Sequence, residues 1–168
     1  MPIKVNLYNT EQANSAFRSF KSLKEEVINI PNSLINAQYM FASSKLTEIP
    51  KLGSKLSNIS HMFDGCIITV NENAKLPSEE GEYFLPNTVT NIDYMFRNVV
   101  NLHGGLTDRF INSNNNLKQL VGTFYGTSIY YLSSDDSIPA LNISTLFPNV
   151  TNVTDLFGYN WSSSYSRV

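Results

Sequence analysis

The residues best suited to chemistry in this chain are one cysteine and two histidines. Cys66 is the single cysteine, and His61 precedes it in "SHMFDGC". A thiolate beside an imidazole could act as a nucleophile paired with its base. His103 lies apart in "LHGGL", and no G-x-S-x-G motif accompanies it. An activity that disappears when Cys66 or His103 is changed would support an enzyme.

The acidic residues do not strengthen that hypothesis. Adjacent acids occur at Glu25–Glu26, Glu79–Glu80 and Asp135–Asp136. Neighbouring side chains in a loop point apart, so these pairs are poor general acid–base partners. The chain has no calcium-loop motif and no phosphate-binding glycine loop. A single cysteine forms neither an internal disulfide nor a zinc cluster. We therefore expect a protein that is not an enzyme, with no catalytic residue, no cofactor and no metal.

The composition of the chain excludes some classes of binding partner. The net charge is −2, and the densest basic stretch, "FRSFKSLK", is followed directly by two glutamates. This balance indicates no nucleic-acid surface. No apolar run approaches the roughly 20 residues that span a bilayer, so no membrane insertion is expected. The beginning, "MPIKVNLYNT", lacks the apolar core of a secretory signal. We expect a protein made in the cytoplasm without a signal peptide.

An internal repeat is the strongest signal in the sequence. Four segments align without gaps: "IPNSLINAQYMF" (30–41), "LGSKLSNISHMF" (52–63), "LPNTVTNIDYMF" (85–96) and "LFPNVTNVTDLF" (146–157). "SNNNLKQLVGTF" (113–124) keeps half of the pattern, and a sixth copy keeps little more than its final phenylalanine. The six anchors are Phe17, Phe41, Phe63, Phe96, Phe124 and Phe157. They lie 24, 22, 33, 28 and 33 residues apart, which indicates one structural unit with loops of different length.

The positions within a copy predict its local structure. Ile92, Met95 and Phe96 are spaced i, i+3, i+4, which is typical of one face of a helical turn. Asn91 precedes that turn, where its side chain could accept backbone N–H groups. Glycine follows the anchor in three copies, as in Gly126, where a left-handed C-cap favours it. Short strands ending in proline are predicted in "EVINIP" (26–31), "LTEIP" (46–50), "EYFLP" (82–86) and "DSIP" (136–139).

No single copy can bury its own apolar face, so neighbouring copies must stack. The predicted fold class is therefore an α/β repeat, a solenoid of short strands and helical turns. Residues 1–26 differ from the copies. "PIKVNLY" alternates as a half-buried strand does, and Ala13, Phe17, Phe20, Leu23 and Val27 fall at helical spacing. We expect a strand–helix cap at 1–26 and the solenoid at 27–168, forming a single domain.

The repeat resembles the BspA-like leucine-rich repeats. These read as Ile-Pro, a Ser-Val pair, an Ile, Ala-Phe, a Cys and a Leu-x-x-Ile strand, and "IPNSLINAQYMFASSKLTEIP" (30–50) follows that order. "VTNIDYMF" and "SNISHMFDGC" are similar to a sister group of bacterial surface repeats. The resemblance covers about residues 27–160, with insertions at 71–84 and 103–116 that break the period. It implies a leucine-rich-repeat-like solenoid in which Cys66 is a small buried filler.

The resemblance also implies a function. Such repeats occur in bacterial surface proteins and in virion proteins of phages. A chain without a signal peptide, rich in Asn, Ile and Ser, favours a phage virion component of the tail, fibre or capsid. The alternative is a fragment of a bacterial cell-surface adhesin whose export signal lies elsewhere. Neighbouring capsid or tail genes would favour the first hypothesis, and a longer reading frame would favour the second.

Aromatic residues outside the anchor positions gather late in the chain. Tyr and Trp are common at the centres of protein interfaces. The predicted partner-binding residues are Tyr159, Trp161, Tyr165, Tyr130 and Tyr131. Covering the last repeat is the competing explanation for them, and it applies equally to Tyr125. The expected partners are protein subunits of a virion or surface assembly, including other copies of this chain. His61 shares its repeat position with Tyr39, Tyr94 and Asp155, and we expect it to point outward. Replacing Asp93 is expected to cost little stability.

Overall fold

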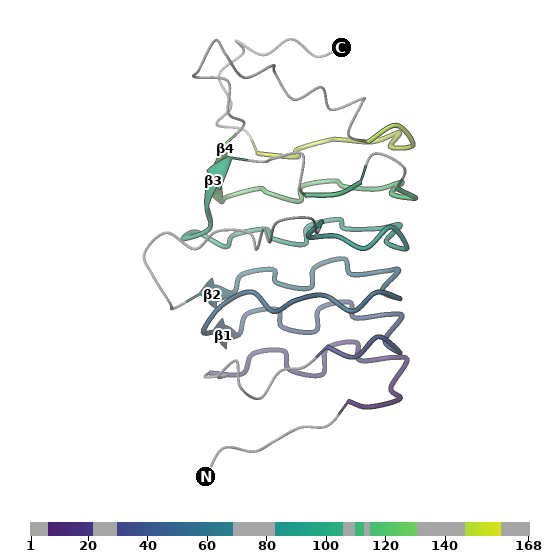
Figure 1. The fold of residues 1–168 in the computed structure, drawn as a ribbon. Helices are drawn as coiled ribbons and strands as arrows, with labels where there is room; N and C mark the ends of the chain where they lie inside the picture. Colours follow the sequence, from purple (N-terminus) through teal and green to yellow (C-terminus); the bar gives the residue numbers. More distant parts are fainter. Residues whose placement is uncertain are drawn as a thin grey trace.

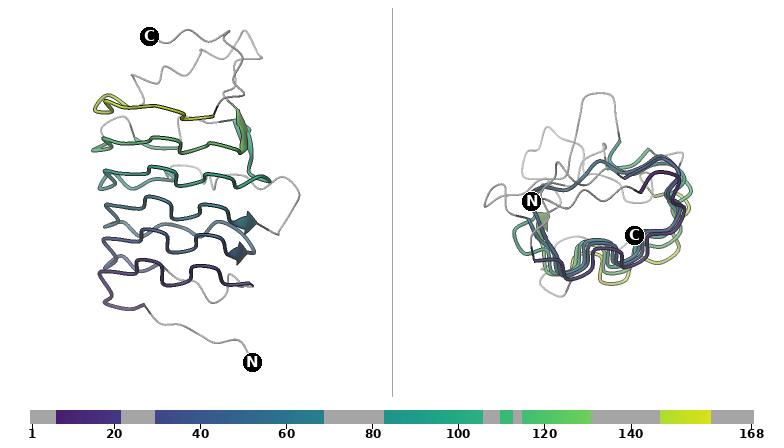
Figure 2. Two further views of the ribbon diagram at one scale, coloured as in Figure 1. Left: turned by 180° about the vertical axis from the view of Figure 1, so that it is seen from behind. Right: turned by 90° about the horizontal axis from the view of Figure 1, so that it is seen from below.

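The repeat units form a stack of coils. The structure is a computed structural model that describes residues 7–21, 30–68, 83–105, 110–112, 115–130 and 147–158; of residues 103–105 and 130 it describes the backbone only. The described coils lie one above another from the N-terminal to the C-terminal end (Figure 1). Seen along the stack they trace nearly the same outline (Figure 2). Neighbours in sequence are therefore neighbours in space.

Parallel pairing holds each coil in register with the next. The described part of the chain has four short strands, and β1 (Lys45–Leu46) pairs with β2 (Ile67–Ile68) as β3 (His103–Gly105) pairs with β4 (Ser128–Tyr130). Isolated parallel bridges join one equivalent amide residue in every coil. These residues are Gln12, Asn36, Asn58, Asn91, Gln119 and Asn152. The same repeat position therefore returns at the same height in six successive coils.

The predicted helical turns are wrong. Among the described residues there is no helix, and so none long and apolar enough to cross a membrane. Tyr39 and Ser43 have φ values of 55° and 57°, whereas a helix requires a φ near −63°. Equivalent residues in the other coils share this left-handed conformation, including His61, Tyr94 and Asn98. The helical-turn α/β class, which the resemblance to leucine-rich repeats also implies, is therefore overturned by a backbone that reverses its twist twice in each coil.

A zigzag of alternating hydrogen bonds replaces the helical turn. The N–H of Met40 donates to the carbonyl of Ala37 in its own coil, over 3.2 Å. The N–H groups of Ala37 and Tyr39 instead donate to Asn58 and Ser60 in the next coil, over 3.0 and 3.1 Å. Half of the donors are therefore satisfied locally, and half require a neighbouring coil. We call the six equivalent stretches, 13–19, 37–43, 59–65, 92–98, 120–126 and 153–158, the zigzag segments.

The predicted N-terminal helix is also wrong where it is described. Ser15 and Ser19 have φ values of 59° and 63°, and the N–H groups of Ala13 and Phe17 donate to the second coil over 2.9 and 2.8 Å. Residues 7–21 therefore form the first coil of the stack rather than a strand and a helix. Most of the strand predicted in "PIKVNLY" lies outside the described residues.

The predicted short strands are mostly not found. "DSIP" and most of "EVINIP" lie outside the described residues. In "LTEIP" only Leu46 belongs to a strand, and in "EYFLP" Leu85 makes one isolated bridge, to Ile111. Pairing lies instead at the bridging amides and at the four strands, where neighbouring coils run parallel.

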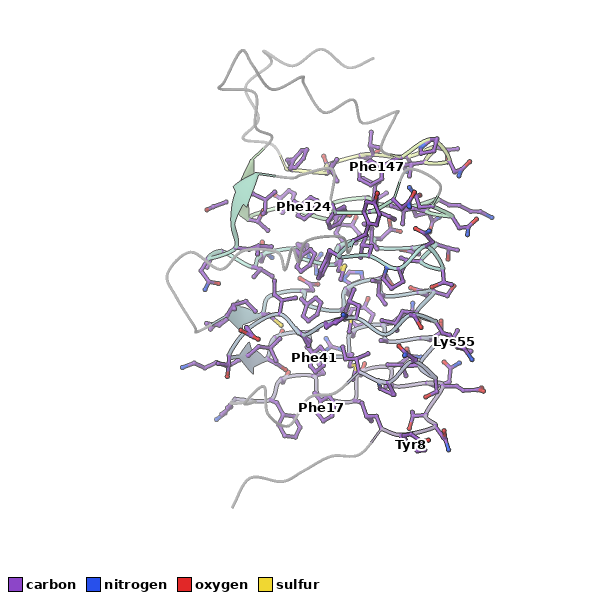
Figure 3. The ribbon with its side chains drawn as sticks, viewed as in Figure 1. Tyr8, Phe17, Phe41, Lys55, Phe124 and Phe147 are labelled. Carbon is purple, nitrogen blue, oxygen red and sulfur yellow. The ribbon has the colours of Figure 1, made fainter. Side chains whose placement is uncertain are left out.

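A column of stacked phenylalanine rings runs through the core. Its members are Phe17, Phe41, Phe63, Phe96, Phe124 and Phe157. Successive ring centroids lie 5.5, 5.6, 5.4, 5.8 and 5.7 Å apart, with nearly parallel planes. Phe41, Phe63 and Phe96 are completely buried, and Phe157, in the last coil, is partly buried. Figure 3 labels three of these rings along the stack. The column is contiguous with one apolar core that extends through all six coils.

Candidate interaction surface

The predicted aromatic patch lies largely beyond the described structure. Tyr131, Tyr159, Trp161 and Tyr165 are outside the described residues, and Tyr130 ends β4 with only its backbone described. Tyr125, the remaining late tyrosine, lies against the last coil. A Cβ atom placed on Gly158 would come within 3.0 Å of its ring. Tyr125 therefore packs between the last two coils, and the roles of the other late aromatic residues stay predictions.

A second aromatic stack lies on the outside of the coils. The rings of Tyr39 and His61 have centroids 4.3 Å apart, and those of His61 and Tyr94 are 4.9 Å apart. A Cβ atom placed on Gly122, the next residue in the series, would lie 2.5 Å from the Tyr94 ring. We call Tyr39, His61 and Tyr94 the outer ladder. It crosses three coils and rests on the glycine of a fourth.

The backbone conformation explains where the outer ladder forms. All three residues have a left-handed backbone, with φ between 55° and 57°. A non-glycine residue in this region costs on the order of 1 kcal/mol. Stacked aromatic pairs recover about 0.5–1.5 kcal/mol each beyond their buried area. The ladder therefore offsets strain that the zigzag imposes. Aromatic residues at one repeat position in three successive copies were a visible signal of it, which sequence reasoning took only as an outward position.

Charged groups complete this surface. Arg97 donates from Nε to Asp64 Oδ1 over 3.0 Å and from Nη2 to Oδ2 over 2.6 Å. Nδ1 of His61 lies 2.9 Å from the same carboxylate. The hydrogen bonds to Asp64 raise the pKa of the Arg97 guanidinium above its ordinary value. Arg97 also lies over the Tyr94 ring, 5.0 Å from its centroid. A planar, charge-assisted fork thus fixes Arg97 against the ladder.

Arg18 caps the other end of the ladder. Its guanidinium lies 5.3 Å from the centroid of Tyr39. No carboxylate pairs with it among the described residues. The Arg97 side chain keeps 39% of its surface exposed, whereas the Asp64 side chain keeps 11%. The surface therefore presents two arginines and the edges of three rings, with its one carboxylate largely covered. It offers hydrogen-bond donors and flat, ordered contact area.

A second surface feature is a shallow open groove of about 500 Å³. Its lining residues are Ile35, Lys55, Ser57, Thr88, Thr90, Asn116 and Lys118. The Thr88 hydroxyl donates across the coils to the carbonyls of Ser54 and Leu56, over 3.0 and 2.7 Å. The hydroxyls of Ser57 and Thr90 lie 3.4 Å apart. These polar groups hold neighbouring coils together, and Lys55 projects at the surface (Figure 3).

The structure separates the residues of the nucleophile hypothesis. Cys66 is buried, and its Sγ donates to the carbonyl of Phe41 over 2.7 Å. Burial raises the pKa of this thiol to about 12. His61 is held in the outer ladder and bonded to Asp64, so the two do not form a thiolate–imidazole pair. The His103 side chain is outside the described structure. The described residues contain no cluster of His, Cys, Asp and Glu able to hold a metal ion.

Comparison of the chain with protein-family models, with curated proteins and with solved structures finds no significant match. The resemblance to BspA-like repeats therefore rests on the repeat residues alone. What the protein does must be inferred from its own surfaces.

Proposed function

We propose that the protein is a non-enzymatic protein-binding and assembly module, and specifically a structural component of a phage virion. The outer ladder with its two arginines is the observation that carries the binding role. Tyr and Arg are the side chains that most often dominate the energy of protein interfaces. A stack of coils holds them in a line along one flank of the molecule.

Prior ordering of these side chains favours binding. Immobilising a flexible side chain at an interface costs about 0.5–1.5 kcal/mol. Arg97 is already fixed by Asp64, and the rings of Tyr39 and Tyr94 are fixed by stacking on His61. Much of that cost is therefore met when the chain folds. The stacked rings offer their edges, so the expected partner supplies backbone carbonyls and carboxylates to the phenols and guanidiniums.

The virion assignment rests on composition and on the resemblance of the repeat. A bacterial cell-surface adhesin, of which this chain is a fragment, is the second candidate, and the same resemblance supports it. The two candidates differ in genetic context. Adjacent capsid or tail genes support the virion component. A longer reading frame with an export signal supports the adhesin.

Binding at the ladder is tested with immobilised chain and solubilised virion or cell-surface proteins. We expect one structural protein to be retained by the wild-type chain and identified by mass spectrometry. Arg97→Ala is expected to weaken that binding at least tenfold, or about 1.4 kcal/mol. Val100→Ala, at an exposed position of the same coil, is the matched control and should bind as the wild type does. Equal binding by Arg97→Ala would remove the ladder from the interface.

A further inference from the structure

The coils are joined by hydrogen bonds with a fixed direction. Within the zigzag segments, every backbone N–H that bonds to a carbonyl of a neighbouring coil donates to the following coil. Examples are Ala13 to Asn36 over 2.9 Å and Ile92 to Gln119 over 3.0 Å. Among the described residues, backbone bonds to the preceding coil come from outside the zigzag segments, such as that from Lys45 to Phe20. The stack therefore has an acceptor end and a donor end.

The first coil exposes the acceptors. In each of the second, third, fourth and fifth coils, four carbonyls accept hydrogen bonds from the coil before it. The equivalent carbonyls of the first coil belong to Gln12, Asn14, Ala16 and Arg18. No hydrogen bond to these four carbonyls from another coil is present in the described structure, and all four residues are exposed. Tyr8 and Phe20, in the same coil, are 78% and 48% exposed. Within the described structure, the first coil thus combines backbone acceptors that no other coil pairs with and exposed aromatic side chains.

The last coil exposes the donors. The N–H groups of Val153 and Asp155 correspond to those of Ile92 and Tyr94, which donate to the following coil over 3.0 and 2.8 Å. Neither Val153 nor Asp155 has such a partner in the described structure. Both residues are exposed, and Val153 keeps 45% of its surface. Unpaired backbone of this kind is a template for another chain with the matching groups.

We propose that copies of this chain associate head to tail, with the last coil of one copy seated on the first coil of the next. The two ends match because both present the same repeat positions. The last coil presents backbone N–H groups, and the first coil presents backbone carbonyls. Continuing the internal register, the N–H of Val153 donates to the carbonyl of Gln12 in the next copy, and that of Asp155 donates to Asn14.

Side chains support the same register. The amides of Asn91 and Gln119 bond across neighbouring coils over 2.6 Å, and those of Asn36 and Gln12 bond over 3.0 Å. Asn152 of one copy would meet Gln12 of the next in the same arrangement. The contact is heterologous, so association is open-ended unless the geometry closes into a ring. The inference rests on the proposed assembly function and names the partner at the ends of the stack as a second copy.

Two end-blocking variants test this. Val153→Lys places a charge on the donor end, and Ala16→Lys places one on the acceptor end. Val100→Lys, at a 67% exposed position on the side of the stack, is the matched control. We expect the sedimentation coefficient of the wild type and of the control to rise with concentration. Each end-blocked variant alone should stay monomeric, and an equimolar mixture should form dimers and nothing larger, because each variant keeps one intact end.

Thermal unfolding of each variant shows whether it is folded. A wild-type chain that stays monomeric at every concentration overturns the inference, as does an end-blocked variant that associates like the wild type. Arg97→Ala separates the test of head-to-tail association from the test of binding at the outer ladder. This variant should self-associate as the wild type does, even where it no longer binds the protein that is retained through the outer ladder. A wild-type chain that does not self-associate but still binds a partner through the outer ladder would contradict only the head-to-tail contact. The proposed binding function would be unaffected.

Discussion

Two aromatic stacks run along the same coils, one inside and one outside. The inner column has phenylalanine at all six positions, from Phe17 to Phe157, with rings 5.4–5.8 Å apart. The outer ladder has aromatic residues at three positions, and Ser15, Gly122 and Asp155 occupy the others. The same coils carry both stacks, and the outer rings lie closer together, with centroids 4.3 and 4.9 Å apart. The two stacks differ in what surrounds the rings.

Close packing explains the uniform interior. A buried ring must fill its layer without voids, and each Phe fits against the rings above and below. The outer position has solvent on one side, so it accepts Ser, Gly, Asp, Tyr or His. The fold therefore restricts the residue type at the inner position. At the outer position the residue type can vary, and it can be suited to binding.

The largest expected effect separates the two stacks directly. Phe96→Ala removes a completely buried ring between Phe63 and Phe124 and should lower the free energy of unfolding by about 3–5 kcal/mol. Phe20→Ala, at a 48% exposed ring that touches Phe17 edge-on, is the control and should cost less than about 1.5 kcal/mol. Urea unfolding measures both. Similar losses for the two variants would mean that the inner column is not the centre of the core.

Alkaline pH should also act on the core. The folded pKa of Cys66 is raised to about 12 from 9.0, so the unfolded state loses this proton first as pH rises. Stability from the neutral thiol is full below pH 9 and falls between pH 9 and 12, by about 1.4 kcal/mol per unit. Cys66→Ala should lose this part of the pH dependence in urea unfolding. Native Cys66 should react slowly with a thiol reagent, and fast native labelling would contradict its burial.

A glycine tests how tightly the outer ladder is packed. Gly122→Ala places a Cβ atom 2.5 Å from the Tyr94 ring, at a φ of 57°, and should cost about 1–3 kcal/mol. In a Tyr94→Ala background the steric part disappears and only the backbone strain remains. A double-mutant cycle by urea unfolding should therefore show that the two substitutions are coupled, with the second costing less than it does alone. An additive result would mean that Tyr94 does not rest on Gly122.

The smallest expected effect concerns Asp93, whose replacement the repeat predicts to cost little stability. Its Oδ1 accepts the N–H of Val121 over 2.7 Å, so the residue links two coils. Asp93→Ala should cost about 1 kcal/mol through the lost hydrogen bond. Asp93→Asn keeps an acceptor and should be close to neutral. Thermal unfolding that finds no difference between the two substitutions would argue that water replaces this contact.

Much of the candidate site could be assembled from the sequence in hindsight. Tyr39, His61 and Tyr94 share a repeat position, and the alignment alone puts them on one line. The partners of the arginines could not be found in this way. Arg97 and Asp64 come from different copies, 33 residues apart, and meet only because their two coils are stacked in register. The predicted patch around Trp161 stays a prediction.

The sequence by itself determined the repeat and the anchor phenylalanines, because a repeated apolar position must be covered by its neighbours. The burial of Cys66 was an implication of the resemblance, and the structure confirms it. The sequence also marked the asparagines: Asn91 accepts the N–H of Asp93 over 2.8 Å, as its place before a turn suggested. Only the tertiary structure decided that the turn is not helical. Both a helix and the zigzag bring Ile92, Met95 and Phe96 to one side and make local hydrogen bonds. They differ in the acceptors of the remaining N–H groups. In a helix these N–H groups donate to carbonyls of the same helix, whereas in this backbone they donate to carbonyls of the next coil. That choice depends on a neighbouring coil that no local pattern contains.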